Sequence, residues 1–428
     1  MLELLILITL AGLILSSSHR MGIANPFQIY FAVWFIIFLW LDISADKYIN
    51  ISDDFIFLLI GLKLLSFSIL LAFFPLCREK PITLKPIEIS KSQDSWILLA
   101  QIIVIAALPF VYDRALAFTE GIDILSIAGH IKLRAVMTND GPDFGLLSYF
   151  FTLSYVVSSL TIFSYRQQGA RLARLLLSIL VSFSYIYLST GRTNVLLFSC
   201  LIFMPLIINK IIGMKGMLIS ALAFAAVFVF LSLTTSKGIS IDDIGWYGHI
   251  IKFWNHLENY TIVPLVAFFQ LLETNPASDL GVHTFRFFIA LQYALGLSDL
   301  QPVSLIKDYI YVYDPINVYT VYEVYFRDFS HWGMLIPPTF LIMHYWLYQK
   351  ANRFSGVWTF YYSASVYPLV MQFFQDQYFS LISTWIQIGF WYWFFIVPKR
   401  MTLYNTENRE NRINDSIASS ESSQSFML

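Results

Sequence analysis

Long apolar runs recur along the whole chain and constrain its fold more than any other feature. Of the 428 residues, 57% are apolar and only 13% are charged, and the mean hydropathy is +0.64. A helix of about 20 apolar residues crosses the hydrocarbon core of a bilayer and satisfies its own backbone N–H and C=O groups. The sequence therefore predicts an all-α, polytopic integral membrane protein.

About eleven transmembrane helices are expected. They form a membrane domain over residues 1–398 and leave 399–428 as a polar tail. No basic residue precedes the first apolar run, which predicts a first span and not a signal peptide. The predicted ranges are 2–17, 25–41, 54–76, 96–117, 145–165, 173–188, 193–209, 216–235, 332–349, 357–374 and 378–397.

Lysine and arginine predict the orientation, because cytoplasmic loops carry an excess of them. They gather in every second connecting segment and in the tail. The amino terminus then faces outward, the carboxyl terminus is cytoplasmic, and the long segment 236–331 is external. Within it, 244–260 is predicted to be an interfacial helix. The stretches 261–272 and 285–297 are expected to be interfacial or re-entrant helices, and the alternative is a hairpin of two extra spans.

The stretch LSTGRTNVLL, residues 188–197, places a permanently charged arginine between two apolar runs. A charge at the bilayer centre costs roughly 2.5–3.5 kcal/mol on insertion scales, so Arg192 is expected in a tight external turn that Gly191 allows. A helix begins there, and an arginine beside a helix amino terminus suits a phosphate group. The alternative is an arginine that only snorkels to the surface.

Residues 308–335 combine six tyrosines with polar side chains directly before a predicted span. Sugar rings offer C–H faces and hydroxyl rims, which fit aromatic faces and hydrogen-bonding edges. Substrate binding is therefore predicted for Asn317, Tyr319, Tyr322, Glu323 and Arg327. The alternative is the aromatic belt found at any membrane surface.

Three short motifs point to a known family. They are the S-x-G-R-x turn at 189–193, the NVYT of 317–320 followed by RDF and a later glycine, and IKLRAVM at 131–137. Together they resemble the Wzy-type O-antigen polymerases, the oligosaccharide repeat-unit polymerases. Family members more often have glycine directly after the Asp-Phe pair, where this chain has Ser330 and, later, Gly333.

The resemblance implies an inner-membrane glycosyltransferase. It would move a growing glycan from its polyprenyl diphosphate onto a new lipid-linked repeat, on the periplasmic face. The implied partners are undecaprenyl-diphosphate-linked oligosaccharides, membrane lipids and a chain-length regulator protein. Sugar composition and linkage are not specified by these motifs.

Such a transfer needs the leaving diphosphate to be stabilised. Arginine stays charged and binds phosphate oxygens with a planar fork. Arg192 and Arg286 are the predicted catalytic arginines, Arg327 follows, and Arg134 is expected to hold the second lipid diphosphate. Solvated external charges or salt bridges are the alternative for these side chains.

The attacking sugar hydroxyl must also lose its proton, which suits a histidine or a carboxylate. Asp328 and His331, three residues apart, are the predicted catalytic pair, with Glu323 and His256 behind them; the alternative for each histidine is an interface residue. The sequence contains no H-E-x-x-H, no paired-cysteine spacing and no phosphate-binding loop. No metal or other cofactor is therefore expected.

Two other functions stay open. An O-antigen ligase would use the same donor but transfer the glycan to lipid A core, and a flippase or other transporter would need charged or broken-helix sites near the midplane. Lys63, inside a predicted span, could snorkel and is given no role. The net charge of −1 argues against a nucleic-acid partner.

Overall fold

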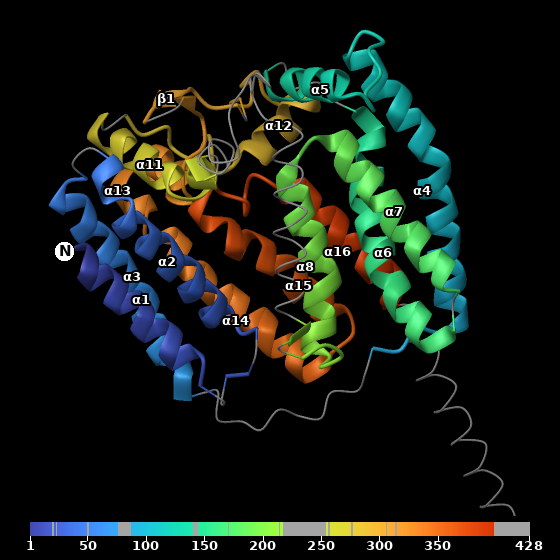
Figure 1. Ribbon diagram of the computed structural model, residues 1–428, viewed down its shortest axis with the longest axis horizontal. Coiled ribbons are helices and arrows are strands. Elements are labelled where there is room, and N and C mark those ends of the chain that lie inside the picture. The colour runs from blue at the N-terminus through green and yellow to red at the C-terminus, as the bar shows by residue number, and fades with distance from the viewer. Residues whose placement is uncertain are drawn as a thin grey trace, which may run out of the picture.

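The computed structural model describes residues 1–18, 21–22, 24–48, 51–75, 87–139, 144–169, 171–213, 215–216, 254–255, 257–274, 277–304, 306–312 and 315–397. For Asn139 and Arg192 it describes the backbone alone. Regular structure in these parts is almost entirely helical (Figure 1), which confirms the all-α prediction. The predicted tail 399–428 and nearly all of the predicted helix 216–235 lie outside the described residues.

Five described helical segments are long and apolar enough to cross a membrane. They are α2 (Pro26–Ile43), α3 (Asp53–Phe73), α4 (Lys91–Phe118), α7 (Leu172–Ser189), and η3 (Gly145–Ser148) continued by α6 (Tyr149–Gln168). Five further helices, shorter or less apolar, are α1 (Leu2–Ser16), α8 (Arg192–Ile208), α14 (Ile336–Phe354), α15 (Val357–Val370) and α16 (Ile382–Ile396). A helix thus occupies ten of the eleven predicted ranges, whereas the number of spans stays a prediction.

Capping side chains fix where several helices begin. Asn25 Oδ1 accepts the Gln28 N–H at 2.9 Å, and Pro26 is the first residue of α2. Ser90 and Gln93 form a capping box at the start of α4. These helix ends are therefore set by local sequence.

The helices pack as two groups that α14 and α15 join. In the first group α1 packs on α2 and α3; in the second, α6 packs on α4, α7, α8 and α16. The hairpin partners α14 and α15 contact each other and reach both groups, since α14 packs on α2 and α3 and α15 on α2, α8 and α16. Each group surrounds its own buried apolar cluster.

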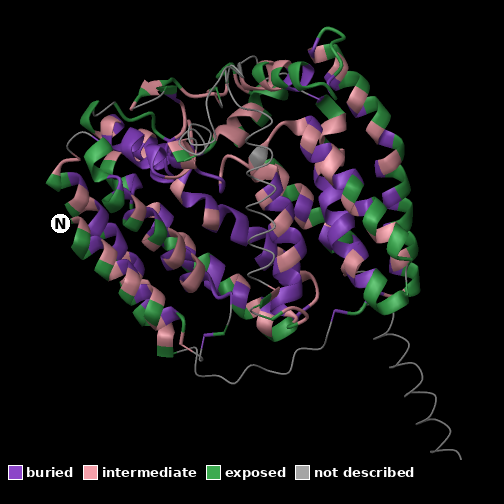
Figure 2. Ribbon diagram, viewed as in Figure 1, coloured by how far each residue is buried: buried purple, intermediate pink, exposed green. Residues whose placement is uncertain are grey.

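The outer helices expose large apolar side chains. On α4, Trp96, Leu99, Ile102 and Phe110 are all more than two-fifths exposed, and Figure 2 shows this helix largely in the colour of exposed residues. Water would disfavour such a surface by about 25 cal/mol per Å² of apolar area, whereas lipid accepts it. The structure thus supports the prediction of a membrane protein.

Six short elements gather at one end of the bundle, the upper end in Figure 1. All come from parts of the chain predicted to be external, and which side of a membrane this end faces stays a prediction. They are α5 (Ile127–Asn139), α11 (Val263–Thr274), α12 (Arg286–Ala294), β1 (Ile310–Tyr311), β2 (Pro315–Ile316) and α13 (Tyr322–Gly333). The strands β1 and β2 form an antiparallel pair.

The helix α11 lies inside the protein. Its residues Val263–Phe269 and Leu271 are all buried, and its rings contact both α3 and α13, with Phe269 5.2 Å from Phe55 and Phe268 6.0 Å from Tyr322. Burial on all sides fits a re-entrant helix and not one that lies on the surface. In contrast, α12 has no buried residue.

Candidate functional site

A buried carboxylate with two cations forms the centre of the candidate site. Glu323, in the first turn of α13, is fully buried. Its Oε1 accepts from Arg327 Nε at 2.5 Å, one helical turn later, and its Oε2 accepts from Lys307 Nζ in the segment before β1. Tyr319 lies beside both cations, with its ring centroid 5.9 Å from each. We call Lys307, Tyr319, Glu323 and Arg327 the Glu323 cluster.

The electrostatics of this cluster keep Glu323 ionised. Burial alone would raise its pKa, but the charges and hydrogen bonds of Lys307 and Arg327 outweigh burial and hold the pKa of Glu323 below its ordinary value. The Lys307 and Arg327 side chains are 21% and 19% exposed. Both cations therefore keep a solvent-facing side that a phosphate or sugar can reach.

The predicted pair Asp328 and His331 is not brought together. Asp328 is buried, and its carboxylate accepts the backbone N–H groups of His283 at 3.0 Å and Thr284 at 2.6 Å. His331 lies beyond a kink at Ser330, is exposed, and has its Nδ1 3.3 Å from the Ser330 hydroxyl. Asp328 thus holds the 277–285 segment against α13.

That segment carries a histidine–carboxylate pair. His283 Nε2 lies 2.9 Å from Asp279 Oδ2, and the Asp279 N–H donates to the Arg327 carbonyl at 2.9 Å. A carboxylate on one ring nitrogen orients the imidazole and leaves the other ring nitrogen to accept a proton, which is the arrangement of a general base. The sequence prediction missed this pair, although the D-x-x-x-H spacing was available as a signal. It also missed Lys307.

The kink after Asp328 places Ser330 in a backbone conformation that favours glycine. Ser330 has φ 52° and ψ −148°, a conformation that glycine adopts with little strain and other residues do not. Gly333 must be glycine for a different reason, because a Cβ there would lie 1.9 Å from the Tyr325 carbonyl oxygen. The chain therefore pairs one strained serine with one sterically required glycine.

Arg286 begins α12, three residues after His283. It is half-buried, and its Nε donates to the Val303 carbonyl at 2.6 Å. Burial lowers the pKa of Arg286 from its ordinary value, yet arginine stays charged. No carboxylate of the described parts of the chain forms an ion pair with Arg286, so its charge is available to an anion.

Arg192 was expected in the turn before a helix at 193–209; it is the first residue of α8, and its side chain is not described. Thr190, at φ 53°, and Gly191 make the turn, and Asn194 Nδ2 donates to Ser189 Oγ at 2.9 Å across it. The amino terminus of α8 points toward the end of the bundle that carries α12 (Figure 1). The predicted tight turn is therefore confirmed, and the role of Arg192 stays a prediction.

Arg134 lies on α5 at the same end. Its Nη2 donates to the Tyr260 hydroxyl at 3.2 Å, and the Tyr260 ring stacks on Phe374 at 5.5 Å. His130, one turn earlier, stacks on Tyr187 at 4.1 Å, close to the end of α7. These contacts place α5 beside the turn that leads to Arg192.

The predicted sugar-binding tyrosines do not form an exposed aromatic face. Tyr319 is buried and donates to the Asp308 carbonyl at 3.1 Å, and Tyr322 is buried with its hydroxyl toward the bundle interior. Asn317 is half-buried. His256 lies outside the described residues.

Lys63 does not snorkel, although its sequence position allowed that option. Lys63 is the eleventh of the 21 residues of α3 and is fully buried. Its Nζ donates to the hydroxyls of Tyr30 at 3.0 Å and Tyr322 at 3.2 Å. The side chain runs inward because these acceptors and the ring of Trp34 replace water around the amine.

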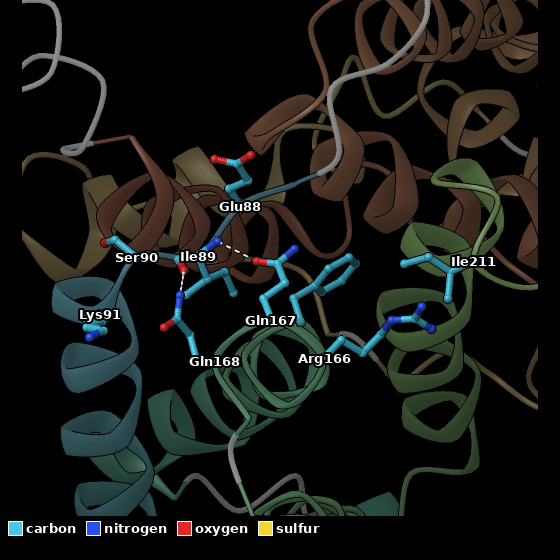
Figure 3. Close-up of a pocket in the computed structure, with 9 residues that line it drawn as sticks. Glu88, Ile89, Ser90, Lys91, Arg166, Gln167, Gln168 and Ile211 are labelled. Carbon is cyan, nitrogen blue, oxygen red and sulfur yellow. Dashed lines mark hydrogen bonds between the residues drawn. The ribbon is translucent and has the colours of Figure 1, made fainter.

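A cavity of about 670 Å³ lies away from all of these residues. The start of α4 and the end of α6 line it, at the opposite end of the bundle. Figure 3 shows Gln167 accepting the Ile89 N–H, at 2.7 Å, and Gln168 beside it. Among the described residues, no group of three or more His, Cys, Asp or Glu side chains could hold a metal ion.

Comparisons with known proteins give one informative similarity. A protein named "Putative O-antigen polymerase" from Escherichia coli (strain K12) is 27% identical over 135 residues, which are 31% of this chain and 34% of that protein. The match thus spans about a third of the relative's length. No family model and no solved structure matches the chain. The similarity supports a distant relationship with a protein of polysaccharide biosynthesis.

Proposed function

We propose that this chain polymerises lipid-diphosphate-linked oligosaccharide repeat units into O-antigen or a similar surface polysaccharide. The Glu323 cluster would face the periplasm of a bacterial inner-membrane protein. One observation carries the proposal: cations with a solvent-facing side, a buried carboxylate and a histidine–carboxylate pair lie together at one end of a helix bundle with a lipid-facing surface. The distant similarity to an O-antigen polymerase supports the same reading.

The reaction assigns a task to each group. A hydroxyl oxygen of the incoming repeat attacks the anomeric carbon of the growing glycan, and the bond from that carbon to the diphosphate breaks. The electron pair leaves with the lipid diphosphate, whose charge Arg286 and Arg192 stabilise. The hydroxyl proton passes to the base.

The base assignment moves from His331 to His283. His283 has Asp279 on Nε2, which orients the ring, whereas the hydrogen bond given for His331 joins its Nδ1 to the neighbouring Ser330 hydroxyl, and its ring lies 5.4 Å from that of Phe326. The ring nitrogen opposite Asp279 is then the atom that takes the proton. Lys307 and Arg327 hold the acceptor sugar or its phosphate from the Glu323 side.

The banding pattern of surface polysaccharide tests the function in a strain lacking the gene. We call this pattern the ladder; each band in it carries one more repeat unit than the last. We expect surface glycan with at most one repeat unit, and a full ladder on complementation. A strain with no glycan on its core would indicate a ligase, and an unchanged ladder would reject both the polymerase and the ligase.

A transporter is the other alternative. Lys63, buried at the middle of α3, is the feature that fits a transporter. Repeat units that accumulate on the cytoplasmic face would favour that function.

Variants in the same strain test the base. His283→Gln and Asp279→Asn should shorten the ladder strongly at matched membrane abundance, and Asp299→Asn, at an exposed position nearby, should not. If His331→Gln abolishes the ladder while His283→Gln keeps it, the base is His331. A reporter inserted at Asp299 should read periplasmic, and one after Arg353 cytoplasmic; the reverse would place the site on the wrong side of the membrane.

A further inference from the structure

Lys63 of α3 lies in a cage of side chains from two other elements. Helix α2 contributes Tyr30 and Trp34, whose ring centroids lie 4.9 and 3.4 Å from Lys63 Nζ. Phe38 on the same helix lies 5.6 Å away, and Tyr322 of α13 lies at the same distance. Among the described residues no carboxylate lies within ion-pair distance of Lys63.

The cage explains how an amine is tolerated at this depth. Aromatic faces attract a cation, and more strongly when water is excluded. The two tyrosine hydroxyls accept two of its hydrogens, and Ser66 Oγ, 2.8 Å from the Tyr30 hydroxyl, extends the polar contacts along α3. Of these partners, only Tyr322 belongs to an element outside α2 and α3.

That partner is the first residue of α13, directly before Glu323. Helix α13 has twelve residues and a kink at Phe329 and Ser330, and so short a helix is not stable on its own. Its position depends on anchors. Within the described residues these include the Val321 N–H on the Gln372 carbonyl at 2.8 Å, the Tyr325 hydroxyl on Asp376 at 2.9 Å, and Lys63 on Tyr322.

We propose that Lys63 is a positioning residue for the Glu323 cluster. By holding the Tyr322 hydroxyl inside the cage, the amine fixes the first turn of α13, and the next residue then meets Lys307 and Arg327. The inference rests on the proposed function for its effect on polymerisation, but the link from Lys63 to α13 is physical and independent of it. A methionine would fill similar space and lacks the donors, so Lys63→Met removes the two hydrogen bonds and keeps most of the packing.

Hydrogen exchange of the full-length protein in lipid nanodiscs tests the link directly. In Lys63→Met and in Tyr322→Phe, we expect amide exchange of the peptide covering 322–329 to accelerate at least tenfold, with α4 and α6 unchanged. Ser66→Ala is the matched control, because it removes a polar contact of the cage that does not touch α13. Unchanged exchange in both test variants, or equal acceleration in Ser66→Ala, would overturn the proposal.

A pH profile of polymerisation gives the second readout. The charged groups on Glu323 are Lys307 and Arg327, with Tyr319 beside them. If α13 loosens, the ion pairs of Glu323 with Lys307 and Arg327 weaken, and the pKa of Glu323 rises toward its ordinary value. The acid limb of the pH profile of polymerisation then moves to higher pH in both test variants. An even loss at every pH would show that Lys63 serves stability alone. If the wild-type chain does not polymerise, the proposed function fails and hydrogen exchange still decides the role of Lys63.

Discussion

Replacing Glu323 with glutamine tests whether the Glu323 cluster stabilises the end of the bundle that carries α13. The variant keeps the side-chain volume and one acceptor oxygen but loses the charge that Lys307 and Arg327 share. Removing one partner of a buried ion pair costs about 3–5 kcal/mol. The two cations are 21% and 19% exposed, so water offsets part of this cost. We expect the free energy of unfolding to fall by about 2–3 kcal/mol.

The pH dependence follows from the lowered pKa of Glu323. A carboxyl with a depressed pKa contributes its stability above the ordinary value of about 4.3, and this contribution is lost as pH falls through the depressed pKa. Wild type and Glu323→Gln should therefore differ most in melting temperature near neutral pH. Their melting temperatures should converge as pH falls below about 4.

The measurement is thermal unfolding of the detergent-solubilised protein between pH 3.5 and 8. Glu120→Gln is the matched control, since Glu120 also pairs with a lysine, Lys132, but is 82% exposed. An exposed pair contributes little, and we expect no shift in melting temperature for this variant. Equal shifts in the two variants, or a difference that stays constant with pH, would refute the reasoning.

Three further changes test other features. Ser330→Gly should raise stability by about 1 kcal/mol, because relief of a strain of about 1–3 kcal/mol exceeds the entropy that glycine adds to the unfolded chain; an unchanged melting temperature would contradict the kink. Gly333→Ala should lower both melting temperature and folded yield, since its Cβ would meet the Tyr325 carbonyl; normal values would contradict this packing. Arg192→Lys should lose most of the ladder at matched abundance, because lysine lacks the planar fork; a full ladder would indicate a snorkelling arginine.

Much of the helical layout could be predicted from apolar run length. The first helix was expected at 2–17 and spans Leu2–Ser16, and the one expected at 173–188 spans Leu172–Ser189. The prediction works because lipid demands a helix wherever a long apolar run enters it. The prediction did not establish the surroundings of α11, because an apolar run of that length has the same sequence pattern whether lipid or protein surrounds it.

The candidate site was harder to predict, because its contacts join irregular segments. Lys307 and Glu323 are sixteen residues apart, with a hairpin between them, and no helical or strand periodicity brings them together. Asp328 and His331 looked like neighbours on one helix face, but the kink at Ser330 separates them. The burial of Lys63 was not predicted for a different reason. Snorkelling assumes a lipid-facing position, and hydropathy does not reveal which face of a span turns inward.

The way Asp328 holds the 277–285 segment has a consequence for how this protein can diversify. Its carboxylate binds two main-chain N–H groups, those of residues 283 and 284, and main-chain groups do not depend on side-chain identity. The path of the segment is thereby kept while exposed positions such as Leu280 change. If the proposed function holds, side chains at these exposed positions can change to suit a different sugar at little cost in stability, because the main-chain path of the segment does not depend on them.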